Sequence, residues 1–88
     1  MLRVSLIAPE ATRYDGDATA VVAPAFDGQV GILTGHAPMM TLLGRGTLRL
    51  TTPHGEELFT VSGGFLQVVD SLVRVVTERA TRAPAPLP

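Results

Sequence analysis

The fold class is decided by the stretch Thr47-Leu48-Arg49-Leu50-Thr51-Thr52-Pro53-His54-Gly55-Glu56-Glu57-Leu58-Phe59-Thr60-Val61. Its first half alternates apolar Leu48 and Leu50 with polar neighbours, and this period of two is typical of a half-buried strand. Pro53-His54-Gly55 combines a fixed φ with a flexible glycine and therefore predicts a turn. A second apolar run follows the turn. The stretch predicts a β-hairpin.

Similar short runs occupy the rest of the chain. No segment has the spacing of a long amphipathic helix, and nine glycines and seven prolines interrupt the sequence at short intervals. We therefore expect an all-β domain, either a β-sandwich or a flattened barrel. The remaining expected strands are Leu2–Leu6, a region from Thr12 to Ala23 broken by a turn at Asp15-Gly16-Asp17, Val30–Leu33, and the pair Phe65–Val69 and Leu72–Thr77 joined across Asp70-Ser71.

Length and composition exclude several classes of protein. The chain has 88 residues, a net charge of −1, seven basic residues that are all Arg, and no Cys. A near-neutral chain is a poor electrostatic match for nucleic acid, and the absence of Cys excludes disulfide frameworks and thiolate sites. No apolar run approaches the roughly 20 residues that span a membrane, and the N-terminal segment is too short for a secretory signal. We expect one domain over residues 1–80, a Pro-rich tail over 81–88, and a cytosolic location.

The residues that could carry catalysis are few and scattered. Neither His36 nor His54 has a carboxylate or a second His at helical spacing, so no metal site is predicted. Ser62 lies in Val61-Ser62-Gly63-Gly64, which is not a nucleophile elbow and instead suggests a tight bend. Glu56 and Glu57 are neighbours and point to opposite faces of a strand. The sequence predicts no catalytic, cofactor or metal site, which favours a binding or structural role.

The segment from Asp27 to Leu43 is the strongest candidate for a functional region. It reads Asp27-Gly28-Gln29-Val30-Gly31-Ile32-Leu33-Thr34-Gly35-His36-Ala37-Pro38-Met39-Met40-Thr41-Leu42-Leu43, and it places four structure breakers beside an apolar run. Such a stretch is either a segment that crosses the core or a docking surface. Met39-Met40 suits docking, because flexible thioethers adapt to a partner. The run is also too densely apolar for strand alternation to bury all of it.

This segment resembles the epsilon subunit of F-type ATP synthases, which is called delta in mitochondria. The resemblance rests on Asp27-Gly28-Gln29-Val30-Gly31, Gly35-His36-Ala37-Pro38, Gly46-Thr47-Leu48-Arg49 and Ser62-Gly63-Gly64 in the same order and spacing, and it extends from Leu2 to about Ala80. It implies about ten short strands in two stacked sheets, and a non-catalytic subunit of the rotor without a cofactor. Two positions depart from the family pattern: Gln29, where many relatives are acidic, and Thr34, where Pro is usual.

The resemblance also implies partners. Asp27, Gly28, Gln29, Val30 and Gly31 would form a loop facing the polar loops of the membrane c-ring, whereas His36, Met39, Met40 and Leu42 would face the gamma subunit. The complex would be a proton-translocating ATP synthase at the cytoplasmic face of a bacterial membrane, with the alpha/beta head contacted only indirectly. We further expect a short form without the C-terminal helical hairpin of most bacterial members, and therefore without its inhibitory function. The alternative is a stand-alone β-sandwich module that binds an unrelated protein.

Overall fold

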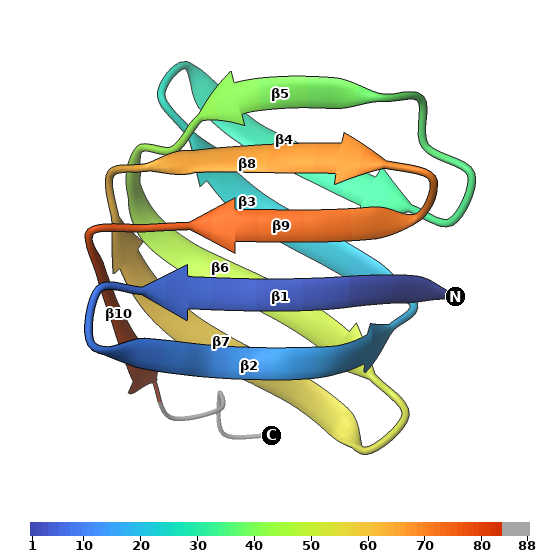
Figure 1. The fold of residues 1–88 in the computed structure, drawn as a ribbon, viewed down its shortest axis with the longest axis horizontal. Helices are drawn as coiled ribbons and strands as arrows, with labels where there is room; N and C mark the ends of the chain where they lie inside the picture. The colour runs from blue at the N-terminus through green and yellow to red at the C-terminus, as the bar shows by residue number, and fades with distance from the viewer. Residues whose placement is uncertain (84–88) are drawn as a thin grey trace.

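The computed structural model describes residues 1–83. Within this range every regular element is a β-strand (Figure 1). The ten strands are β1 (Leu2–Ala8), β2 (Ala11–Ala18), β3 (Ala20–Ala25), β4 (Gly28–Leu33), β5 (Met39–Leu42), β6 (Arg45–Thr52), β7 (Gly55–Ser62), β8 (Phe65–Val69), β9 (Leu72–Val76) and β10 (Arg79–Ala83).

The strands form two stacked sheets of five, which confirms the predicted sandwich. The first sheet has the order β2-β1-β9-β8-β5, and the second has the order β10-β7-β6-β3-β4. Figure 1 shows the first sheet in front of the second, with β4 and β5 as edge strands at the same side of the sandwich. All pairings are antiparallel except β1 with β9.

The hairpin predicted from Thr47 to Val61 is present as β6 and β7. Thr52 pairs with Gly55, so Pro53 and His54 form a two-residue turn. Gly55 has a φ of 118°. The Thr52 hydroxyl donates to the Gly55 carbonyl at 2.7 Å and accepts from the His54 amide at 3.1 Å. The turn is thus fixed by local hydrogen bonds as well as by its residue types.

The core lies between the sheets and follows from the alternation of the strands. Inward positions of both sheets carry Leu, Val, Ile, Phe or Ala, and the largest fully buried side chain is Phe59. One open side is closed by the Tyr14 ring, which packs edge-on against Phe59 at 6.5 Å, while the Arg82 guanidinium lies 4.8 Å from the Phe59 ring centre. The fully buried side chains include Leu2, Val4, Leu6, Val21, Ile32, Leu48, Leu50, Phe59, Val61, Leu66, Val68 and Val73.

The prediction of a turn at Asp15-Gly16-Asp17 was wrong. These residues continue β2 and pair with β1, and the chain bends at Thr19 instead. Arg3, on the neighbouring strand, pairs with Asp15 at 3.0 Å and with Asp17 at 3.8 Å. Tyr14 lies over Gly16, and its hydroxyl donates to the Asp17 carbonyl at 2.8 Å. The cross-strand ion pairs and the covering aromatic ring override the local turn signal.

Both tight connections around β8 agree with the sequence. Asp70 and Ser71 have φ values of 51° and 64°, as a two-residue hairpin turn between β8 and β9 requires. Gly63 and Gly64 have φ values of 72° and 100° and make the bend between β7 and β8. The backbone conformation of this bend therefore requires the two glycines of the Ser-Gly-Gly sequence.

The last described strand extends past the expected domain end at residue 80. Thr81, Arg82 and Ala83 pair with β7, so part of the expected 81–88 tail belongs to the second sheet. The Pro-alternating residues 84–88 of that tail lie outside the described residues. In residues 1–83 there is no helix long and apolar enough to cross a membrane.

Candidate interaction surface

The segment Asp27–Gly31 begins in a hairpin turn and continues as an edge strand. Ala25 pairs with Gly28, so Phe26 and Asp27 alone form the turn between β3 and β4. Gly28 to Gly31 are the first four residues of β4, which corrects the expectation of a loop. Asp27, Gly28, Gln29 and Gly31 are exposed, and Val30 packs partly against the core. Four of the five residues are therefore accessible.

The apolar run after Pro38 forms the short edge strand β5, whose side chains alternate. Met39 is partly buried against the core, and Leu43 is buried. Met40 and Leu42 point outward and are 64% and 61% exposed. The expectation that alternation leaves part of this run exposed is confirmed. Of the proposed gamma-facing residues, Met39 is turned inward, whereas Met40 and Leu42 are free to meet a partner.

The β3–β4 turn and the end of β5 are joined by backbone hydrogen bonds. The Phe26 amide donates to the Leu42 carbonyl at 3.2 Å, and the Gly44 amide donates to the Pro24 carbonyl at 2.8 Å. Figure 1 shows this turn beside the end of β5. Phe26 is 69% exposed, so it extends the surface formed by Met40 and Leu42. We call Phe26, Met40 and Leu42 the apolar edge.

Sequence reasoning did not identify Phe26 as part of this surface. The available signal was its position directly before Asp27-Gly28, where a turn places a side chain in solvent. Together with Met40 and Leu42, the exposed Phe26 ring forms a cluster of apolar side chains, and such clusters mark interaction surfaces. The apolar edge therefore joins two of the expected gamma-facing residues, Met40 and Leu42, to the residue directly before the expected c-ring-facing segment.

His36 lies at the other end of β4 from this turn. Gly35, with a φ of 87°, and a hydrogen bond from the His36 amide to the Leu33 carbonyl at 3.1 Å form a tight turn there. His36 is partly buried, and its Nδ1 donates to the Ala37 carbonyl at 2.6 Å, since a carbonyl oxygen can only accept. Five residue steps separate Gly28 from Leu33, about 17 Å along the strand. The structure thus does not bring His36 close to Asp27.

The titratable groups of the described chain are mostly exposed. In residues 1–83 no three His, Asp or Glu side chains are grouped so that they could hold a metal ion. Burial raises the pKa of Tyr14, and the nearby carboxylates of Glu57 and Asp17 raise it further. Tyr14 lies on the β2 side of the sandwich and closes the core there, so its shifted pKa reflects packing.

Comparison with known proteins identifies close relatives of this chain. Residues 1–83 match the family described as "ATP synthase, Delta/Epsilon chain, beta-sandwich domain". The ATP synthase epsilon chain of Rhodopirellula baltica is 47% identical over 79 residues, which cover 90% of this chain and 62% of that protein. The epsilon chain of a Psychrobacter species is 46% identical over 71 residues, covering 80% and 51%. This chain thus spans between about half and two thirds of the length of these relatives.

Solved structures show the same fold. A chain in the cryo-EM structure of the Euglena gracilis mitochondrial ATP synthase superposes with a TM-score of 0.84 at 24% identity, covering 92% of this chain and 52% of that one. A chain in the Tetrahymena thermophila mitochondrial ATP synthase central stalk and c-ring superposes with a TM-score of 0.75 at 17% identity, covering 91% and 65%. At these identities the superpositions establish the architecture alone.

Proposed function

Since this chain belongs to the ATP synthase delta/epsilon family, we propose that it is a non-catalytic subunit of the central stalk of a proton-translocating F-type ATP synthase. It links the gamma subunit to the polar loops of the c-ring and helps to couple rotation to ATP synthesis. It meets the alpha/beta head only indirectly. Its location is peripheral, at the cytoplasmic face of a bacterial membrane.

The single observation that carries the proposal is the apolar edge. Met40 and Leu42 are more than half exposed on a strand of a small domain, and Phe26 lies beside them. Large exposed apolar side chains that gather at one place mark a surface that a partner covers. We assign the gamma contact to Met40 and Leu42, with His36 at the far end of the same side of the sandwich.

The c-ring contact is assigned to the exposed turn and strand from Asp27 to Gly31. A Cβ atom built on Gly28 or Gly31 would meet nothing within 4 Å, so neither glycine is needed for packing inside this chain. A glycine on an exposed edge lets another backbone approach closely. Gln29 offers an amide, and therefore a hydrogen bond in place of an ion pair.

The test of this proposal is co-purification with the gamma subunit of the same organism. Met40→Glu and Leu42→Glu place a charge in the expected interface and should weaken binding about 30-fold, the equivalent of about 2 kcal/mol for a central interface residue. Thr12→Glu is the matched control, because Thr12 is exposed on β2, which is the edge of the first sheet opposite β5.

Circular dichroism spectra should show that all three variants remain folded. If Met40→Glu and Leu42→Glu bind gamma as well as Thr12→Glu does, the assignment of the surface is incorrect. If the unchanged chain does not bind gamma at all, the proposed function fails, and a β-sandwich module with an unrelated partner becomes the better description.

A further inference from the structure

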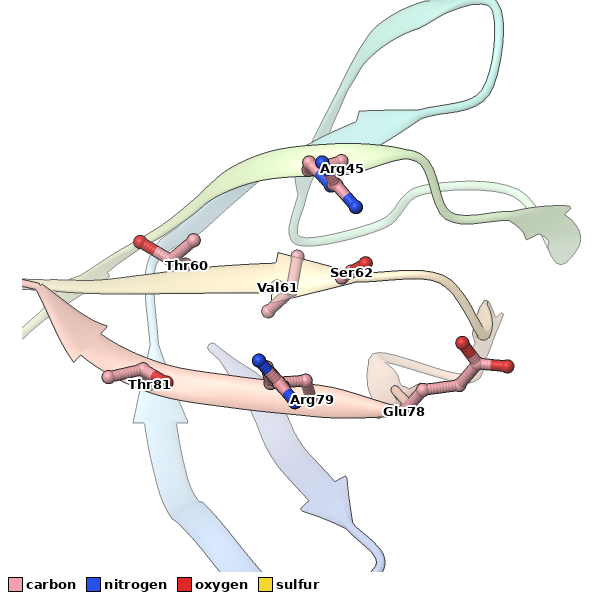
Figure 2. A pocket seen from close by; sticks show the side chains of 7 residues that line it. All are labelled: Arg45, Thr60, Val61, Ser62, Glu78, Arg79 and Thr81. Carbon is pink, nitrogen blue, oxygen red and sulfur yellow. The ribbon is translucent and has the colours of Figure 1, made fainter.

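The outer face of the second sheet has an open hollow that the proposed function does not use. It lies over β6, β7 and β10 and has a volume of about 610 Å³. Figure 2 shows its walls. The lining residues are Arg45, Thr60, Val61, Ser62, Glu78, Arg79 and Thr81.

The sheet register brings two arginines to the same place from distant parts of the sequence. Arg45 on β6 and Arg79 on β10 both pair with Ser62 on the strand between them. Their Cα atoms are thus two strand spacings apart, about 10 Å. Figure 2 shows one arginine on each side of β7 near Ser62. Because directly paired residues project to the same face, all three side chains lie on the outer face of the sheet.

These two arginines lack the partners that most other arginines of the chain have. Arg3, Arg13, Arg49 and Arg82 each form an ion pair with an Asp or Glu. Within residues 1–83, Arg45, Arg79 and Arg74 form none. Two like charges facing one strand repel each other, so the pair is stabilised by an anion placed between them.

Hydroxyl groups complete the donor set. Ser62 lies between the arginines, and Thr60 and Thr81 form the next cross-strand pair along the hollow. The one lining carboxylate, Glu78, is at the end of the hollow. Its Oε2 is 2.9 Å from the position that a Cβ on Gly63 would take, and Figure 2 shows the group turned toward that bend. Two arginines and one glutamate leave the hollow with a net positive charge.

Hydrogen bonds to the backbone hold the Cα atoms of Arg45 and Arg79 at a fixed spacing. The Gly63 amide donates to the Gly44 carbonyl at 3.3 Å, which ties the residue after Ser62 to the residue before Arg45. On the other side, the buried Thr77 hydroxyl lies 3.2 Å from the Ser62 carbonyl and 3.0 Å from the Arg79 carbonyl and can donate to either. A site with a fixed spacing loses less entropy when it binds a ligand.

We propose that Arg45, Ser62 and Arg79 form a binding site for a tetrahedral oxyanion of the phosphate class. The planar guanidinium groups match the paired oxygens of a phosphate, and a hydroxyl between them supplies a third donor. This site is separate from the apolar edge, so a negative result for one leaves the proposal for the other unchanged.

The test is a titration of the ¹⁵N-labelled 88-residue chain with inorganic phosphate, followed by amide chemical shifts. At constant low ionic strength set with chloride, we expect saturable shifts at Arg45, Ser62 and Arg79. Arg45→Gln and Arg79→Gln should each weaken binding about fivefold, which corresponds to about 1 kcal/mol for an exposed ion pair. Arg74→Gln is the matched control, because Arg74 is an exposed arginine without an ion pair on the first sheet.

A parallel titration with ADP shows whether the phosphate of a nucleotide is bound more tightly than the free ion, and saturation with either supports the site. The proposal is overturned if neither phosphate nor ADP gives saturable shifts at Arg45, Ser62 and Arg79. It is also overturned if chloride or acetate gives the same shifts, or if Arg74→Gln weakens binding as much as the other two substitutions.

Discussion

The most demanding prediction about the fold concerns the substitution of Gly64. It lies in the bend between β7 and β8 with a φ of 100°. A Cβ atom placed there would be 1.9 Å from the Val76 carbonyl oxygen and 2.7 Å from the Thr77 Cα. Both neighbours are backbone, so no side chain can rotate away. Gly64→Ala must move β9 relative to the bend.

The magnitude can be estimated from two contributions. A left-handed backbone conformation costs a non-glycine residue about 1–2 kcal/mol. Overpacking that displaces the backbone adds about 1–3 kcal/mol. It also strains the hydrogen bond from the Leu43 amide to the Gly64 carbonyl at 2.9 Å. A total of about 4 kcal/mol is a large part of the roughly 5–15 kcal/mol that stabilises a typical domain.

The matched control is Gly35→Ala. Gly35 has a φ of 87°, but a Cβ there would meet nothing within 4 Å, so the substitution introduces backbone strain without a clash. At about 4–8 °C per kcal/mol for a domain of this size, Gly64→Ala should lower Tm by about 15–30 °C and Gly35→Ala by about 10 °C. Thermal and urea unfolding followed by far-ultraviolet circular dichroism measure both. Equal decreases in Tm for Gly64→Ala and Gly35→Ala would refute the predicted clash.

Two further predictions concern the exposed strand and the pH dependence of stability. Gly31→Val should leave the fold and Tm nearly unchanged, because its Cβ enters open space on a strand that favours β-branched residues; in washed membranes it should reduce proton-driven ATP synthesis, and unchanged synthesis would count against the c-ring assignment. The folded-state pKa of Tyr14 is raised, so protonated Tyr14 contributes fully to the free energy of unfolding below the unfolded pKa of about 10. This contribution is lost as pH rises through the folded pKa. Urea unfolding between pH 9 and pH 12 should show this loss in the unchanged chain and a smaller one in Tyr14→Phe; equal losses would show that other groups cause it.

Strands marked by polar–apolar alternation or by flanking turn residues could be predicted from the sequence, whereas β5 and β10 could not. The hairpin β6–β7 was predicted because Leu48 and Leu50 alternate with polar residues and Pro53 ends the run. β5 has only four residues, three of them apolar, so its sequence does not show which side chains face the core. β10 is a polar strand, and only its pairing with β7 defines it.

The main wrong prediction, the turn at Asp15-Gly16-Asp17, came from a local sequence signal that is correct for an isolated peptide. Asp15-Gly16-Asp17 favours a turn, but here the two carboxylates flank Arg3 of the neighbouring strand, and Tyr14 covers the glycine. Both effects depend on tertiary contacts. The same limitation applies to the oxyanion site, because Arg45 and Arg79 are far apart in the sequence and only the register of three strands brings them to Ser62.

The apolar edge and the oxyanion site are connected by a short and well-anchored piece of chain. Leu42 belongs to the first and Arg45 to the second, and only Leu43 and Gly44 separate them. The Leu43 amide donates to the Gly64 carbonyl at 2.9 Å, and the Gly44 amide donates to the Pro24 carbonyl at 2.8 Å. Coupling between two sites requires an element with two arrangements, and a junction anchored on both sides provides fixed spacing instead. Surface substitutions at Leu42 and at Arg45 should therefore act separately, whereas Gly64→Ala, which disturbs the anchor itself, should affect both sites.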